Sequence, residues 1–370
     1  MLRASRGEQR LGQFRRWHIA VLALLAAGCS PHKKLIEFGW DEPDTAFMRA
    51  HIQEMERMPF DGCVYHATYA RPGGTGPFMW EAWSRRAFTP AELDAARRDL
   101  RATRFRRFRY NFLRLNVTPG DLDWFDDYGA VRANVRLAAR LAREGRSRGI
   151  LLDTEMYQAP LFTYAKQRGA PARSWAEYAA QARRRGHEVL EALQEGYPGL
   201  TVLLTFGYSL PWMQSLGGKQ PLAECQYGLL APFLDGMVEA ARGRTRIVDG
   251  YELSYGYRDP PQFAAARRTM KEELLPLVAD RAAYARVVSV GFGLWVDYNW
   301  RAHGWRTDHP EANYFTPPVF EQSLRAALSA ADEYVWVYTE TPRWWTTTGG
   351  PKDLPADYIN AVRRSRVAAR

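Results

Sequence analysis

The stretch Gly149-Ile150-Leu151-Leu152-Asp153 is a short apolar run that ends in a carboxylate. An amphipathic stretch over residues 174–195 follows it, and a second apolar run covers residues 200–206. Ser174-Trp175-Ala176-Glu177 fits a capping box, in which the serine and the glutamate satisfy free backbone N–H groups at a helix start. A strand, a helix and a second strand in this order are typical of the unit that builds parallel sheets.

The same alternation of strands and helices continues in both directions along the chain. The expected strands are residues 35–39, 62–66, 112–116, 149–153, 200–206, 247–253, 287–293 and 334–339. The expected helices are residues 44–58, a helix from about residue 90, and 129–148, 174–195, 228–242, 260–278, 317–332 and 357–366. Eight such units in order predict an α/β fold, a single (β/α)8 TIM barrel.

An open doubly wound sheet is the alternative arrangement of such units. That fold normally carries a glycine-rich phosphate-binding turn after its first strand. Here the first strand runs into Gly39-Trp40-Asp41-Glu42-Pro43-Asp44, an acidic and aromatic loop that would repel phosphate. The loop therefore favours the closed barrel.

The beginning of the chain has the composition of an export signal. Five arginines precede an apolar run over residues 19–27, which is the order of a secretory signal peptide. The run is shorter than the roughly 20 residues that a membrane-spanning helix needs. Leu25-Ala26-Ala27-Gly28-Cys29 resembles a bacterial lipobox, with Cys29 as the lipidated residue. Ordinary cleavage is the alternative, because Ala26 stands where leucine is more usual.

These features predict two parts of the chain, a lipoprotein signal peptide over residues 1–28 and a barrel over residues 29–370. The resemblance implies a lipid-anchored protein of the bacterial cell envelope, or a periplasmic or secreted protein if the lipobox is not used. Ser30, rather than aspartate, follows Cys29, which favours the outer membrane. We expect a monomer that contacts the membrane through its N-terminal anchor.

Composition excludes several other functions. The net charge is +10, but the excess is spread along the chain, whereas nucleic-acid binding needs a concentrated basic face. The seven histidines show no HExxH or other metal-ligand spacing, so we expect neither a metal nor a cofactor. Cys63 and Cys225 are expected either to form a disulfide or to be buried free thiols.

Carboxylates follow three of the expected strands. Asp153 and Glu155 follow the fourth strand and share one face, because side chains alternate along a strand. Glu252 lies at the end of the sixth strand and Glu340 at the end of the eighth. Active sites of barrels lie at these strand ends, and two carboxyl groups across a cleft are what glycoside hydrolysis requires.

We therefore expect Glu155 to be the general acid, with Asp153 raising its proton affinity through like charge. Glu340 is the preferred nucleophile or base, and Glu252 is a rival for either role. The structural alternative is that these carboxylates cap helices or pair with arginines such as Arg114.

Aromatic side chains cluster in the same expected loops and suit the apolar faces of sugar rings. About half of the tryptophans are expected only to pack loops onto the barrel. The expected substrate-binding residues are Trp40, Asp41, His66, Asn116, Tyr157, Tyr255, Trp295, Asp297, Trp344 and Trp345.

The order of units, with Glu155 after the fourth strand and Glu340 after the eighth, resembles the (β/α)8 glycoside hydrolases. The large retaining clan has an Asn-Glu pair after its fourth strand, where this chain has Thr154-Glu155, and its nucleophile follows the seventh strand, where this chain has Asp297. The chitinase-like group has an Asp-x-Glu after the fourth strand and a tryptophan on the eighth, similar to Asp153, Glu155 and Trp344.

The leading hypothesis is an envelope-tethered glycoside hydrolase acting on a poly- or oligosaccharide. The first alternative is a carbohydrate-binding barrel lipoprotein without catalytic activity. A barrel enzyme of other chemistry, such as a polysaccharide deacetylase or lyase, is the second alternative, and the absence of metal-ligand spacing argues against a deacetylase.

Overall fold

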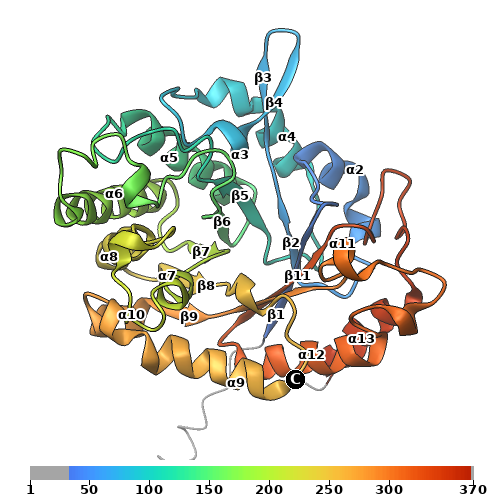
Figure 1. Ribbon diagram of the computed structural model, residues 1–370. Helices are drawn as coiled ribbons and strands as arrows, with labels where there is room; N and C mark the ends of the chain where they lie inside the picture. Colours follow the sequence, from blue (N-terminus) through green and yellow to red (C-terminus); the bar gives the residue numbers. More distant parts are fainter. Residues whose placement is uncertain (1–32, 368–370) are drawn as a thin grey trace, which may run out of the picture. The chain divides into compact units, whose positions relative to one another are not determined.

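The computed structural model describes residues 33–367, so the expected signal peptide and Cys29 lie outside the described residues. Within this range the parallel strands form a closed (β/α)8 barrel (Figure 1). Its strands are β1 Lys34–Gly39, β2 Gly62–Tyr65, β5 Phe112–Asn116, β6 Gly149–Asp153, β7 Thr201–Leu204, β8 Arg246–Asp249, β9 Val288–Val290, β10 Phe292–Trp295 and β11 Tyr334–Thr339.

The barrel closes through its seventh strand, which is split into two short segments. β9 pairs with β8, and β10 pairs with β11, both in parallel. The two segments are separated by Gly291, whose N–H donates to the carbonyl of Asp249 at 2.8 Å. A Cβ at residue 291 would lie 2.9 Å from the side chain of Val248, so the close approach of the chain to β8 at this point favours glycine.

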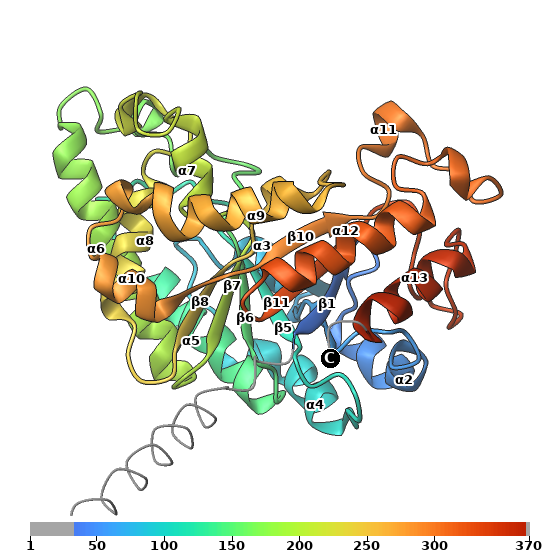
Figure 2. The same ribbon diagram turned by 90° about the horizontal axis from the view of Figure 1, so that it is seen from below.

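Helices surround the strands on the outside of the barrel (Figure 1). They include α2 Thr45–Met55, α4 Asp94–Ala102, α5 Gly129–Glu144, α6 Trp175–Gly196, α8 Leu230–Ala240, α9 Pro260–Arg268, α10 Arg281–Val287, α12 Pro317–Ala330 and α13 Ala356–Val367. The capping box predicted at Ser174 is present at the start of α6. The short helix α11, Trp300–His303, comes between β10 and α12 in the chain. Figure 2 shows that it stands apart from this ring of helices.

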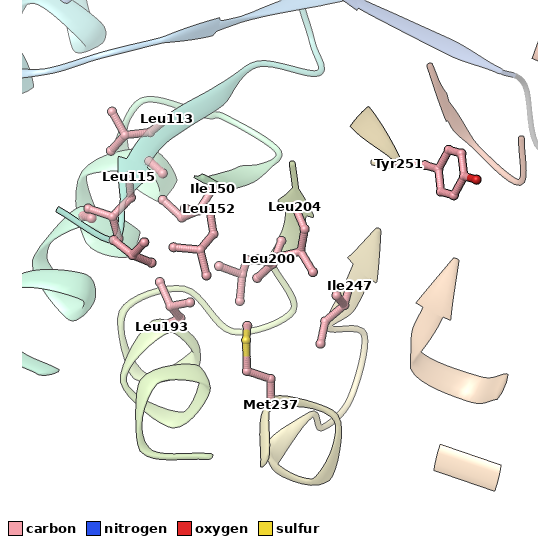
Figure 3. Packing of buried hydrophobic residues seen from close by; sticks show 14 of the residues in the cluster. Leu113, Leu115, Ile150, Leu152, Leu193, Leu200, Leu204, Met237, Ile247 and Tyr251 are labelled. Carbon is pink, nitrogen blue, oxygen red and sulfur yellow. The ribbon is translucent and has the colours of Figure 1, made fainter. Parts of the chain in front are cut away.

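The alternation of side chains along each strand creates two apolar layers. Phe112, Leu151 and Leu203 point into the barrel and belong to the inner cluster. Their neighbours Leu113 and Leu152 belong to the outer cluster, in which Leu152 lies toward Leu193 of α6 and Met237 of α8 (Figure 3). A buried leucine contributes about 1.5–3 kcal/mol, so these two layers stabilise the ring of strands.

The structure differs from the sequence prediction around the sixth and seventh strands. The sixth strand ends at Asp249 rather than at residue 253, and Glu252 lies in the short 3-10 helix η4 Glu252–Ser254. The single helix expected over residues 260–278 is instead the α-helix α9, which ends at Arg268, followed by a π-helical turn and a 3-10 turn. Helix α10 was not predicted, because its seven residues are too few to show a helical period.

Two further observations concern the described part of the chain. Cys63 and Cys225 are both buried free thiols, which answers the question that the sequence left open. Among residues 33–367, no helix is long and apolar enough to cross a membrane.

Candidate active site

A cavity of about 730 Å³ opens at the carboxyl ends of the barrel strands. Residues from most of the strand ends contribute to it. Its walls are formed by Phe38, Gly39, Trp40, Glu42, His66, Met79, Trp80, Arg114, Asp153, Glu155, Tyr157, Thr205, Glu252, Tyr255, Trp295, Tyr338, Glu340 and Arg343. The side chains that fill the interior of the barrel are mostly apolar. At the carboxyl ends of the strands they give way to charged groups, which line the cavity above this apolar interior.

Arg114 lies at the centre of a buried ion-pair network in this cavity. Its Nη2 is 2.7 Å from Asp153 Oδ2, and its Nη1 is 2.9 Å from Glu42 Oε2. Glu42 also lies 3.2 Å from His66 Nδ1. Burial opposes ionisation of Glu42, but Arg114 and His66 outweigh it and lower the pKa of that carboxyl. Arg114 therefore holds Glu42 in the charged form and joins it to Asp153 through one guanidinium group.

Glu155 follows β6 and is half-buried beside this network. The backbone N–H of Glu155 donates to Asp153 Oδ1 at 3.1 Å, which turns the chain at the strand end. Burial raises the pKa of Glu155, and the charge of Asp153 adds to the increase, while Tyr157 and Arg114 act against it. Among residues 33–367, no cation lies within ion-pair distance of this carboxyl group.

Glu252 reaches the same cavity from an unusual turn after β8. The preceding Tyr251 has a φ of 45°, in the left-handed region that costs a non-glycine residue energy. Asp249 holds this turn, because its Oδ1 accepts the N–H of Tyr251 at 3.1 Å. Burial raises the pKa of Glu252 well above its usual range, and the charges of Glu155 and Asp153 raise it further. The turn therefore directs a proton-retaining carboxyl toward Glu155.

Glu340 follows β11 and has strong partners of its own. Its Oε2 accepts the indole N–H of Trp300 at 2.8 Å and lies 2.7 Å from Arg301 Nη1. Both partners come from α11, which thus covers this side of the cavity. In the barrel order β11 lies opposite β6, so Glu340 and Glu155 occupy opposite walls.

Asp297, expected to bind substrate, lies outside the cavity wall and supports the strand-eight loop instead. Its Oδ1 accepts the N–H of Glu340 at 3.0 Å and the indole N–H of Trp295 at 2.8 Å. Its Oδ2 accepts the N–H of Thr341 at 2.8 Å. These bonds use both oxygens of Asp297 to position its neighbours.

The structure brings most of the predicted site residues together. The four proposed catalytic carboxylates and five of the proposed binding residues line the cavity, the latter being Trp40, His66, Tyr157, Tyr255 and Trp295. Asp41 and Trp345 line a neighbouring cavity.

Besides Asp297, two other predicted binding residues line neither cavity. Asn116 is buried and does not line the cavity, and its Oδ1 accepts the Nε–H of Arg114 at 2.9 Å. Trp344 is 0% exposed and packs edge-on against Phe60, because its position after the strand turns the indole into the layer between barrel and helices.

Glu42, Trp80 and the central role of Arg114 were not predicted. The signal for Arg114 is visible in the sequence, since a charged residue in the middle of the apolar strand Phe112–Asn116 must have a partner. Trp80 lies in the short helix α3 Phe78–Glu81, with its ring 5.0 Å from that of Tyr157, and no periodicity indicated that contact.

The neighbouring cavity has a volume of about 840 Å³ and shares Trp40, Glu42, His66 and Arg343 with the first. Its other walls come from the loop after β11 and from the start of α2. The two cavities therefore adjoin across these four side chains.

No protein-family model matches the sequence, and a search of curated proteins finds no significant relative. Solved structures with a similar fold include a GH5_18 protein from Streptomyces cattleya in complex with GlcNAc. It has a TM-score of 0.46 and 12% sequence identity, and the match covers 91% of this chain and 81% of that one. A GH5 xyloglucanase from Bacteroides ovatus has a TM-score of 0.44, 12% identity, and coverage of 98% and 78%. An endocellulase from Pyrococcus horikoshii has a TM-score of 0.43, 11% identity, and coverage of 91% and 92%.

Proposed function

We propose that the protein is a glycoside hydrolase whose paired carboxyl groups are Glu155 and Glu252. The observation that carries the proposal is that both groups line one cavity and both have a raised pKa, with Glu155 contributing to the shift of Glu252. Hydrolysis of a glycosidic bond needs one protonated and one ionised carboxyl group on either side of the scissile bond.

The environment of each group suggests its role. Glu252 is the more buried of the two and is raised by both Glu155 and Asp153, so it retains the proton and donates it to the leaving oxygen. Glu155 is less buried, and a hydrogen bond with Tyr157 and the charge of Arg114 oppose the increase in its pKa. It therefore ionises before Glu252 and attacks the anomeric carbon or activates water. This order reverses the role that the sequence suggested for Glu155.

The rest of the cavity suits a sugar. Trp40, Trp80 and Trp295 offer indole faces to the apolar faces of pyranose rings, and Tyr157 and His66 offer polar atoms to hydroxyl groups. A few placed polar groups in an aromatic cavity are the usual composition of a small-molecule site. Glu340 is already engaged by Arg301, so we assign it to substrate positioning rather than to the reacting pair.

Two variants test the assignment. Glu252→Gln removes the acid and should slow cleavage of an unactivated oligosaccharide by about 10²–10⁴-fold. The decrease in the cleavage rate of this variant should be much smaller on a nitrophenyl glycoside, because a nitrophenolate leaves without being protonated. Glu155→Ala should slow both substrates, and added azide should restore part of the rate by acting as a substitute nucleophile or base.

Glu272→Gln is the matched control, because Glu272 is exposed and lies outside both cavities. Wild-type protein that binds glycans but cleaves none across a broad panel would contradict hydrolysis and favour a binding protein. Full activity in Glu155→Ala or Glu252→Gln would remove that residue from the mechanism.

We also propose that the enzyme acts at the cell envelope on a glycan that is accessible from a lipid anchor at Cys29. The support is the lipobox-like sequence alone. Cys29→Ser should release the protein from the membrane fraction of the cell without changing the activity of the barrel. Retention of the variant in the membrane fraction would contradict anchoring at this residue.

A further inference from the structure

The cavity beside the proposed active site contains two cations that lack a carboxylate partner. Arg343 and Lys352 lie directly opposite each other in a two-residue antiparallel bridge, with N–H···O distances of 2.8 and 3.0 Å in the two directions. Directly opposed residues present their side chains on one face, and two like charges in this arrangement are destabilising. Both residues line the cavity, and neither has an ion pair among residues 33–367.

Three carboxyl groups also line this cavity, but each already has an internal partner. Glu42 is paired with Arg114 and His66. Asp44 caps α2 by accepting the N–H of Phe47 at 2.7 Å. Asp41 is half-buried, and its Oδ2 accepts the N–H of Trp344 at 2.6 Å. Burial raises its pKa, although the charge of Arg343, which is not at ion-pair distance, acts against the increase. The groups left to meet a ligand are therefore the two cations.

The remaining walls resemble a surface for a sugar ring. Trp40 is 55% exposed and lies between the two cavities, with the guanidinium groups of Arg301 and Arg343 at 5.5 and 5.8 Å from its ring centre. The hydroxyl-bearing residues Thr346, Thr347 and Thr348 line the other side. An exposed indole beside hydroxyls and free cations offers contacts to a pyranose that carries a negative charge.

We infer that the second cavity binds an anionic sugar unit of the substrate, through Arg343 and Lys352, while the neighbouring unit occupies the first cavity. The anion is a ring carboxylate or a sulfate ester, which share the same charge recognition. This inference rests on the proposed hydrolase function and names its substrate class as an acidic glycan. Arg343 lines both cavities and thus lies where two adjacent sugar units would meet.

Calorimetric binding to the Glu155→Ala variant tests the inference without turnover. The ligands are oligosaccharides of glucuronic, galacturonic and mannuronic acid, the methyl ester of each, and a sulfated neutral oligosaccharide with its unsulfated parent. The two members of each pair share the same sugars and linkages and differ in one substituent, which is charged in one member and neutral in the other. At least one charged member should bind about tenfold more tightly than its uncharged form, equivalent to ~1.4 kcal/mol, and added salt should reduce the difference.

Arg343→Gln and Lys352→Gln should each lower the affinity for the charged ligand several-fold more than the affinity for its uncharged form. Arg244→Gln and Lys219→Gln are matched controls, because both residues are exposed and line neither cavity. Tighter binding of the uronate or of the sulfate ester would each support the inference and identify the anion. Equal affinity for all charged and uncharged pairs, or a preference unchanged in both variants, would overturn it.

Turnover assays on the same ligands separate this inference from the proposed function. If the protein binds acidic ligands more tightly but cleaves none of them, the anion-binding site is supported and the hydrolase function is contradicted. If it cleaves neutral glycans and binds acidic ones no more tightly, the hydrolase function is supported and the anion-binding site is contradicted.

Discussion

Two groups of carboxylates lie side by side at the mouth of the barrel. Asp153 and Glu42 contact Arg114, and Glu340 contacts Arg301, each within 2.9 Å. Glu155 and Glu252 face the same cavity, and no cation among residues 33–367 lies at ion-pair distance from either of them. The difference indicates that arginines hold the first group in place, whereas the second group has raised pKa values and is suited to exchange protons.

The largest effect on stability should follow from loss of the central cation. Arg114→Gln leaves the carboxylates of Asp153 and Glu42 buried without their partner, and breaking a buried pair costs about 3–5 kcal/mol. The free energy of unfolding from urea titration should fall by that amount at pH 7. The exposed Arg244→Gln should change it by less than about 0.5 kcal/mol. A loss no larger than in this control would mean that Arg114 does not hold the two acids.

A smaller effect is expected at Glu340, because Arg301 and Trp300 already hold its carboxylate. Glu340→Gln keeps the shape and the acceptor for Trp300 but weakens the contact with Arg301. We expect kcat to fall about tenfold, or ~1.4 kcal/mol, well short of the loss in Glu252→Gln. Steady-state kinetics on an unactivated oligosaccharide provide the comparison. A loss as large as in Glu252→Gln would place Glu340 in the reacting pair.

Glu37 extends the comparison to an acid outside the cavity. It is fully buried, and neither carboxyl oxygen has a hydrogen-bond partner among the described residues. Burial raises its pKa well above its usual range, and Asp41 adds to the increase. A raised folded-state pKa contributes stability at low pH that is lost as the pH rises above the unfolded-state value.

Glu37→Gln should therefore gain stability relative to the wild type as the pH rises above about 4.5, by up to about 1.4 kcal/mol per pH unit. Urea titrations at intervals from pH 4 to pH 8 measure the difference. Asp357→Asn, at an exposed position in the first turn of α13, is the control. Stability curves that stay parallel for Glu37→Gln and wild type would contradict a protonated Glu37.

Periodicity and strand-end position predicted the barrel and much of its mouth. The strands at residues 112–116, 149–153 and 334–339 have the predicted bounds, because each is a short run of buried side chains closed by polar residues. Asp153 and Glu155 were placed together because alternation along a strand is a local property.

What the sequence did not show depends on contacts between distant segments. Glu42 and Arg114 are 72 residues apart and meet only when the barrel closes. Trp344 and Asp297 have the residue types of a sugar site, but one is buried in the outer core and the other holds backbone N–H groups. The turn that directs Glu252 into the cavity depends on a left-handed tyrosine, which residue preferences disfavour.

Titration of the two unpaired glutamates tests the central claim most directly. Carbon NMR of protein with labelled glutamate carboxyl groups, with Glu155→Gln and Glu252→Gln used to assign the signals, follows each proton without any substrate. We expect the pKa of Glu252 to lie well above its usual range and above that of Glu155, and to fall in Glu155→Gln because a neighbouring charge is lost. A Glu252 that titrates in the usual range, or one that is unaffected by Glu155→Gln, would contradict the coupled pair.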